Sequence, residues 1–376
     1  MDKKNRILYI TDASLETAYS GTARHIRNGF INNGFEVIEC IVPLPVLPAV
    51  NFKKSIYNRF FKSIYIYKRD KKVIRMHNKN IKDKIKAIEY DIVFSNFEWN
   101  LSYLKTDKPI YCWPDNFFTD FVNFYASPWA KISIRNGLEQ TKAYYKNTTA
   151  TIYSSKWALD TAQKTDWVNS PVYFVPYGIG VKKSLSNAEI LNKKKEHGNN
   201  LNLIWIGLDA ERKGLKKSIS IVNQLNDQGI KSVLSVIGIS GDTTDNIHFY
   251  GKLSKHNPNE LKQFQMLLTQ ADLMLFLTLA DSTPMVIGEA LSYGVPVITH
   301  NVGGVASLMD ESCGCLFDLN SSVEDIVNWI FTYQKNEDTK REMAKNALQF
   351  ADNNLNWDNS MASVCAIIQD HLNEGE

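Results

Sequence analysis

The stretch Asp281-Ser-Thr-Pro-Met-Val-Ile-Gly-Glu-Ala-Leu-Ser-Tyr-Gly-Val-Pro-Val-Ile298 predicts a helix start between two buried strands. The apolar runs Leu273 to Thr278 and Val295 to Thr299 are the strands, and Pro284 suits the first turn of a helix. A helix start offers backbone N–H groups and a positive dipole end to a phosphate. Asp281 and Glu289 flank this turn and could accept hydrogen bonds from sugar or ribose hydroxyls, although ordinary helix capping would explain the same residue types.

The same alternation of strand and helix extends outward from this stretch. A helical pattern covers Thr22 to Asn33, and a last helix, Asn359 to His371, follows a break at Asn353-Asn354. Strands separated by helices imply parallel sheets with right-handed crossovers and helices on both faces. The other predicted strands are Arg6 to Thr11, Phe35 to Val42, Asp91 to Ser95, Pro109 to Trp113, Ala150 to Ser154, Val172 to Pro176, Leu201 to Gly207, Val233 to Gly238 and Ile247 to Tyr250.

The chain is long enough for two such units. It has 376 residues, whereas a domain typically has about 150. A polar interlude, Val181 to Asn200, separates two runs of strands and reads as a linker. We therefore expect an α/β protein of two Rossmann-like domains facing a central cleft, residues 1–180 and 181–355, with residues 356–376 as a C-terminal helix.

Composition places the chain among globular proteins. Hydrophobic residues make up 44% and charged residues 22%, and no apolar stretch approaches the roughly twenty residues of a membrane-spanning helix. The N-terminus runs directly into a strand, which predicts no signal peptide and a cytoplasmic protein. The five scattered cysteines fit reduced thiols in that compartment.

The charge is unevenly distributed. The chain carries +3 overall, but Lys53 to Lys86 holds thirteen Lys or Arg and two acids, hence +11. Phe52, Ile56, Phe60 and Ile64 recur every four residues beside it. This pattern is typical of a basic amphipathic helix on an anionic membrane surface, at the inner face of the cell membrane. A helix packed on the sheet is the alternative, and we expect no nucleic-acid partner.

Several common sites have no support in the sequence. No Gly-x-Gly-x-x-Gly follows a strand, no Walker-type loop occurs, and no two aspartates are separated by one residue. The seven histidines show no zinc spacing. We expect neither a cofactor nor a metal ion.

The opening stretch resembles the Glu-x(7)-Glu motif of family 4 glycosyltransferases, the group 1 glycosyl transferases, which have the GT-B fold. Nearly every fixed position matches, with Asp281 in place of the first Glu, and Gly303-Gly304 follows as in the family. The resemblance implies a GT-B enzyme that transfers a sugar from a nucleotide-diphosphate sugar with retention and without a metal ion. It also implies that the last helix crosses back to the N-terminal domain.

Three further segments carry the resemblance. Trp205 to Gly214 matches the family's loop after the first strand of the C-terminal domain, with Arg212 and Lys213 as the cations that hold the diphosphate, although Leu208 replaces the family's Arg. Ser20 to His25 resembles a Gly-Gly-x-x-x-His loop, in which Gly21 approaches the donor and His25 contacts sugar or acceptor, unless His25 is only a packed histidine. Ile110 to Phe118 places Trp113 and Asp115 at a strand end that faces the cleft, with Pro114 where the family often has His.

The resemblance assigns roles residue by residue. Glu289 would hold the ribose hydroxyls, and Asp281, Ser282 and Thr283 would face the sugar. Arg212 and Lys213 would neutralise the diphosphate, aided by the N–H groups of Met285, Val286 and Ile287. Gly251, Lys252 and Leu253 are candidates for the base, and Trp113 and His25 for sugar or acceptor contact. The catalytic candidates are Asp115, Asp281, Arg212 and Lys213.

Two other functional classes remain open from the sequence. Leu208 and Pro114 would suit a non-catalytic partner subunit of a glycosyltransferase complex, and a sugar-nucleotide epimerase of the same fold would need no acceptor. The expected acceptor is a glycan or lipid-linked molecule of surface polysaccharide or lipopolysaccharide synthesis. Neither the sugar nor the base follows from these residues.

Overall fold

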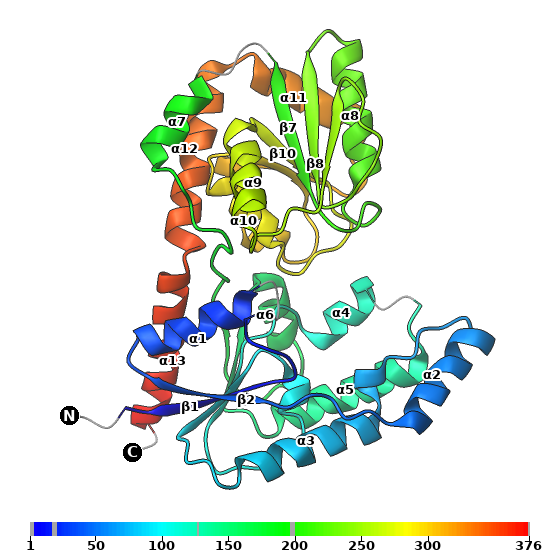
Figure 1. Ribbon diagram of the computed structural model, residues 1–376, viewed down its shortest axis with the longest axis vertical. Coiled ribbons are helices and arrows are strands. Elements are labelled where there is room, and N and C mark those ends of the chain that lie inside the picture. The colour runs from blue at the N-terminus through cyan, green and yellow to red at the C-terminus, as the bar shows by residue number, and fades with distance from the viewer. Residues whose placement is uncertain (1–3, 17–20, 126–127, 196–199, 375–376) are drawn as a thin grey trace. The chain divides into compact units, whose positions relative to one another are not determined.

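The computed structural model describes residues 4–16, 21–125, 128–195 and 200–374, without the side chains of 193–195. The chain divides into two compact units (Figure 1). Unit 1 comprises Met1–Tyr177 and Trp357–Glu376, and unit 2 comprises Gly178–Asn356. The C-terminal helix α13 (Trp357–Glu374) therefore belongs to unit 1, although it follows unit 2 in sequence.

Unit 1 is built on a parallel six-stranded sheet of order β2-β1-β3-β4-β5-β6. One face is covered by α1 (Thr22–Asn32) and α13, which approach so closely that a Cβ on Gly29 would lie 2.1 Å from Met361. The other face packs on α3 (Lys71–Ile85) and α5 (Lys131–Tyr145). The strands are β1 (Arg6–Thr11), β2 (Glu36–Ile41), β3 (Ile92–Ser95), β4 (Ile110–Cys112), β5 (Ala150–Tyr153) and β6 (Val172–Phe174).

The remaining elements of unit 1 lie around this sheet. Two short 3-10 turns precede and follow α3 in the chain. The helices and turns are α2 (Pro48–Phe60), η2 (Tyr67–Arg69), η3 (Glu98–Asn100), α4 (Phe118–Tyr125) and α6 (Lys156–Gln163).

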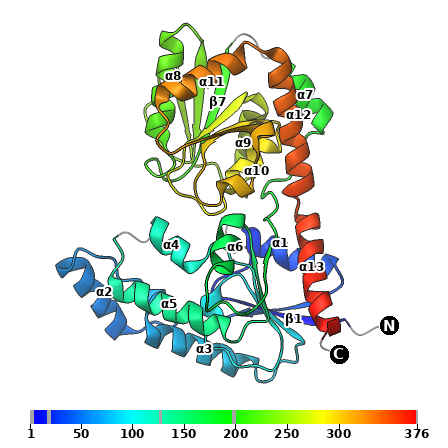
Figure 2. The same ribbon diagram turned by 180° about the vertical axis from the view of Figure 1, so that it is seen from behind.

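Unit 2 repeats the architecture with a parallel sheet of order β12-β11-β10-β7-β8-β9. Figure 2 shows the same sheet and helices from behind. The strands are β7 (Leu201–Ile206), β8 (Ser232–Ile237), β9 (Ile247–Gly251), β10 (Leu273–Phe276), β11 (Val297–His300) and β12 (Gly314–Phe317). The helices are α7 (Asn187–Lys195), α8 (Leu215–Asp227), α9 (Pro258–Gln270), α10 (Met285–Leu291), α11 (Val323–Gln334) and α12 (Glu337–Asn354), with short turns at Val305–Ser307 and Glu311–Cys313.

The predicted fold class is confirmed, with two local corrections. The polar interlude is not only a linker, because α7 forms inside it and buries Ile190 completely in the core of unit 2. The edge strand β12 was not predicted, because its four residues, Gly314–Phe317, are too short a run to stand out. No helix in the described ranges is long and apolar enough to cross a membrane.

Candidate functional site

Glycines line the carboxyl edge of the sheet in unit 2, where β7, β8 and β9 end. The N–H of Gly207 donates to the carbonyl of Ile237 (2.9 Å), and that of Gly238 donates to Gly251 (2.7 Å). A Cβ on Gly238, whose φ is +111°, would lie 2.0 Å from the carbonyl oxygen of Gly207. Only glycine allows this approach, and it leaves backbone at the edge where ligands bind in such folds. Gly251 was predicted for this place, whereas Gly238 was not.

The loop after β7 is tied to the loop after β10. The N–H of Leu279 donates to the carbonyl of Arg212 at 2.7 Å, and Trp205 Nε1 donates to the carbonyl of Lys213 at 2.9 Å. Gly214, with φ +70°, ends the loop, and a Cβ there would lie 2.1 Å from the carbonyl oxygen of Leu277. The backbone of both loops therefore fixes where Arg212 and Lys213 stand.

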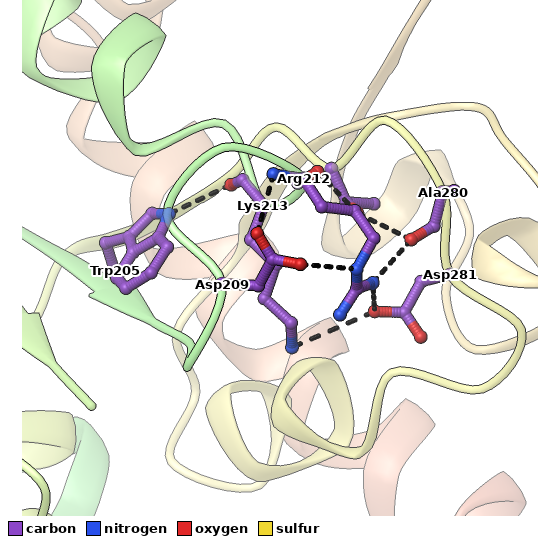
Figure 3. A network of polar contacts seen from close by, with 7 residues as sticks. Trp205, Asp209, Arg212, Lys213, Ala280 and Asp281 are labelled. Atoms are coloured by element: carbon purple, nitrogen blue, oxygen red, sulfur yellow. Dashed lines mark hydrogen bonds and ion pairs between the residues drawn. The ribbon is translucent and has the colours of Figure 1, made fainter. Parts of the chain in front are cut away.

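The two predicted cations and the predicted acid Asp281 form one cluster (Figure 3). Arg212 Nη1 lies 3.3 Å from Asp281 Oδ2 and donates to the carbonyl of Ala280 at 2.6 Å. Lys213 Nζ lies 3.8 Å from the same Asp281 oxygen. Asp209, which the sequence analysis did not single out, accepts from Arg212 Nε at 3.2 Å. Four charges thus share one end of the sheet.

Lys213 is the most enclosed of these groups. Its side chain is 14% exposed, and its ammonium lies 4.9 Å from the ring centroid of Phe276. Burial lowers the pKa of Lys213 below that of an ordinary lysine, while the charges of Asp281 and then Asp209 and Glu289 act in the opposite direction. Because its charge raises the pKa of Lys213, the carboxylate of Glu289 also belongs to the surroundings of this lysine.

Glu289 has a buried carboxylate, and only one of its two oxygens has a partner among the described residues. It lies on α10 and is 1% exposed. Its Oε1 is ion-paired with Lys255, and its Oε2 has no hydrogen-bond partner among the described residues. A Cβ on Gly180 would lie 3.3 Å from Oε1, which is a tight contact. An ionised carboxylate held in this way can accept hydrogen bonds from a diol. Lys255 was missed, because a lone lysine in a loop carries no signal.

The start of α10 differs in detail from the prediction. Pro284 precedes the helix rather than forming its first turn, and the N–H of Ile287 donates to the carbonyl of Pro284 at 3.0 Å. Ile287 is also fully buried, so its N–H is not available to a phosphate, and that expectation is wrong. Met285, Val286 and Thr283 are half-buried and Ser282 is buried, while Lys252 is exposed and Leu253 half-buried after β9.

The N-terminal glycine loop is partly described. Gly21 has φ +89° and precedes α1, whereas Ser20 lies outside the described residues. The imidazole of His25 stacks on the indole of Trp357, with ring centroids 5.0 Å apart and planes at 5°. Burial, and then the charge of Arg24, lower the pKa of His25. His25 is thus packed against α13, which is the alternative that the sequence left open.

Trp113 and Asp115, at the end of β4, differ in burial: Trp113 lies in the core and Asp115 lies at the edge of the sheet. Trp113 is fully buried, and its Nε1 donates to the carbonyl of Val175 at 3.0 Å. A sugar contact through its ring is therefore excluded, because the ring fills the interior of unit 1. Asp115 is half-buried and accepts from Asn116 Nδ2 at 2.6 Å.

Asp115 belongs to a charged group that sequence reasoning did not find. Burial and Arg69 lower the pKa of Lys68, against which Asp12, Glu98 and Asp115 act. Asp12 directly follows β1, and Lys68 lies in η2, 4.3 Å from the ring centroid of Trp99. These residues come from four segments that are far apart in the chain, so no local spacing could have linked them.

Comparisons with known proteins concern the family and the fold of the chain. Residues 180–350 match the family described as "Glycosyl transferases group 1". No curated protein matches the chain.

Solved structures similar to the whole chain have the GT-B fold. The sucrose-phosphate synthase of Thermosynechococcus elongatus has a TM-score of 0.73 at 13% identity, covering 99% of this chain and 100% of its own. HepE of Anabaena, solved in complex with UDP and glucose, has 0.62 at 13% identity, covering 97% and 100%. WaaG, a glycosyltransferase involved in lipopolysaccharide biosynthesis, has 0.63 at 16% identity, covering 96% and 99%. Residues 180–350 are therefore similar to the group 1 glycosyl transferases, and the fold of the whole chain is GT-B.

Proposed function

We propose that this protein is a retaining glycosyltransferase that moves a sugar from a nucleotide-diphosphate sugar to a glycan or lipid-linked acceptor. The observation that carries the proposal is the cluster of Arg212, Lys213 and Asp281 at the carboxyl edge of the sheet in unit 2. A diphosphate leaving group needs fixed cations, and an arginine and a buried lysine supply them.

Each group has a place in the reaction. The bond between the anomeric carbon and the diphosphate oxygen breaks, and the diphosphate keeps the electron pair, so that negative charge grows beside Arg212 and Lys213. The oxygen of the acceptor hydroxyl forms the new bond to the anomeric carbon, and its proton passes to the departing diphosphate. The spare Oε2 of Glu289 would accept from a ribose hydroxyl. Asp281, Ser282 and Thr283 would face the sugar, and Gly251 to Leu253 the base. Asp115, in unit 1, is the candidate on the acceptor side.

The comparisons guide the choice of substrates. HepE was solved with UDP and glucose, which makes UDP-glucose the first donor to test. WaaG belongs to lipopolysaccharide biosynthesis, which supports a glycan or lipid-linked acceptor in surface polysaccharide synthesis. We place the enzyme in the cytoplasm, at the inner face of the cell membrane, where such acceptors are built.

The test is a panel of nucleotide-sugars. Binding is measured by thermal shift, and slow hydrolysis of the donor by water is measured as release of the nucleoside diphosphate. We expect one donor to raise the melting temperature and to be hydrolysed, and we expect EDTA to leave the rate unchanged. Loss of hydrolysis with EDTA that manganese or magnesium restores would contradict the metal-free reaction. A sugar epimer formed without acceptor would instead indicate an epimerase.

One observation favours a second candidate, a non-catalytic partner subunit. Leu208, at the position of the family's Arg, is 70% exposed and provides no charge to a diphosphate. If no nucleotide-sugar shifts the melting temperature or is hydrolysed, this second function replaces the first.

A further inference from the structure

The basic segment Lys53 to Lys86 folds into two helices that differ in how they are held. On α3, Val73, Ile74 and Ile81 are fully buried against unit 1, and Asp70 accepts from the N–H of Lys72 to begin the helix. The basic side chains of α3 lie on its outer side. This half of the segment is therefore a helix packed on the sheet, the alternative that the sequence analysis named.

The other half, α2, makes few buried contacts with the rest of unit 1. Of its thirteen residues only Val50 is buried. Tyr57 packs inward on Tyr65, with ring centroids 5.2 Å apart. Phe52 and Phe60 are 70% and 71% exposed, and Phe61, directly after the helix, is 64% exposed. Figures 1 and 2 place α2 at the end of unit 1 farthest from α13.

The exposed aromatics are concentrated on α2 and directly after it. Phe52 and Phe60 lie two helical steps of four residues apart, so they share one side of α2. Phe61, whose ring centroid lies 5.2 Å from that of Tyr57, and Ile64, which is 43% exposed, add further exposed apolar side chains after the end of the helix. Four large apolar side chains exposed within thirteen residues (Phe52, Phe60, Phe61 and Ile64) favour an interaction site over ordinary surface.

The charges beside these aromatics are available to a partner. Lys54 and Arg59 are exposed and form no ion pair with any described residue. Lys53 differs, because it pairs with Asp70 at 3.6 Å and lies 4.7 Å from the ring centroid of Tyr65. Lys62 follows Phe61 with φ +46°.

We propose that α2 and residues 61–64, here called the α2 tip, dock this protein on an anionic lipid bilayer, with the aromatic rings of Phe52, Phe60 and Phe61 inserted among the headgroups. The inference rests on the proposed function in one respect, since a lipid-linked acceptor is reached from that surface. Exposed aromatics next to unpaired cations match an interface that is apolar within and negative at its surface. A net charge of +11 over 34 residues, Lys53 to Lys86, adds long-range attraction.

Two variants and a matched control test the α2 tip. The charge variant is Lys54→Glu with Arg59→Glu, and its control is Lys79→Glu with Lys82→Glu, which makes the same charge change on exposed residues of α3. The aromatic variant is Phe52→Ser with Phe60→Ser. Lys53 and Lys62 stay unchanged, because the first is paired and the second has a left-handed backbone. Circular dichroism and thermal melting verify that each variant is folded.

The measurement is co-sedimentation with phosphatidylglycerol–phosphatidylcholine vesicles, and with pure phosphatidylcholine vesicles, at low and high salt. We expect the full-length protein to bind the anionic vesicles at low salt. The charge variant should bind at least about tenfold more weakly, and the control less than about threefold. The aromatic variant should lose the part of the binding that persists at high salt.

Three results would overturn the proposal. The first is wild-type protein that stays in the supernatant with anionic vesicles at low salt. The second is vesicle binding that the charge variant and its control weaken equally. The third is full displacement of the protein from the vesicles by duplex DNA at matched charge. Donor hydrolysis, measured on the same samples, separates this proposal from the proposed function. Vesicle binding without hydrolysis contradicts only the enzyme assignment, and hydrolysis without vesicle binding contradicts only the α2 tip.

Discussion

Arg212 and Asp281 stand 69 positions apart in the chain, yet Arg212 Nη1 lies 3.3 Å from Asp281 Oδ2. Lys213 shares the same oxygen at 3.8 Å. One carboxylate thus holds two cations at the end of a sheet, in a place suited to a diphosphate. A donor diphosphate would compete with Asp281 for both cations, and this competition makes the cluster testable.

Removing both cations should abolish most of the transfer. We predict that Arg212→Ala with Lys213→Ala lowers the transfer rate at least about a hundredfold, equivalent to roughly 3 kcal/mol of transition-state stabilisation. The measurement is kcat/KM with the donor identified in the screen. The control is Lys216→Ala, which removes an exposed charge on α8. Turnover at the wild-type rate in the double variant would refute the diphosphate assignment.

Neutralising Asp281 should separate donor binding from turnover. In Asp281→Asn the two cations lose their shared carboxylate and are left for the diphosphate, so we predict tighter binding of the free nucleoside diphosphate by about three- to tenfold. Transfer should nevertheless slow, because the carboxylate facing the sugar is gone. Isothermal titration gives the affinity and steady-state kinetics the rate. Weaker diphosphate binding in this variant would show that Asp281 orients the cations rather than competing for them.

The sequence predicted most of the fold because most of the parallel strands are short, mainly apolar runs bounded by glycine or a polar loop. It also singled out Arg212, Lys213 and Asp281, which lie together in the structure, and the buried Glu289, since each lies inside a local motif of fixed spacing. What it missed depends on contacts between distant segments. Lys255 reaches Glu289 across 34 positions, and Lys68 meets Asp12 and Asp115 only in the folded unit.

Two features that the sequence could not resolve have a related physical cause. Trp113 stands at a strand end, where a side chain can face either the ligand edge or the interior, and the strand pattern does not say which. The basic segment looked uniform in composition, yet α3 buries one side and α2 does not. Burial is set by the partner surface, which the local sequence does not contain.

The lowered pKa of Lys213 should determine where kcat/KM begins to fall at alkaline pH. Burial lowers this pKa, so the ammonium loses its proton at a lower pH than an exposed lysine does. Because the diphosphate needs the charged form, we predict that kcat/KM falls as pH rises through the lowered pKa. In Lys213→Arg the charge persists, so the limb should move to higher pH. The profile is measured from about pH 7 to pH 10, with Lys216→Arg as the control. Superimposable profiles of wild type and Lys213→Arg would contradict this role.

Asp120 should make the protein less stable at neutral pH. It lies on α4 and is 7% exposed, and its Oδ2 has no partner among the described residues. Burial raises its pKa to about 6, against a hydrogen bond with Thr161. The unfolded carboxyl ionises near its ordinary pKa of about 4, while the folded one keeps its proton up to about 6. The free energy of unfolding therefore falls as pH rises between these values and stays reduced above them.

Replacing Asp120 by Asn removes this penalty while keeping the size of the side chain. We predict that Asp120→Asn raises the free energy of unfolding at pH 7 by about 1–2 kcal/mol and flattens its dependence between about pH 4 and pH 6. Denaturant unfolding at several pH values measures both effects. Asp160→Asn, an exposed change on the neighbouring α6, is the control and should alter neither. If the two variants respond alike to pH, the buried carboxyl is not the source of the slope, because only Asp120 leaves water on folding.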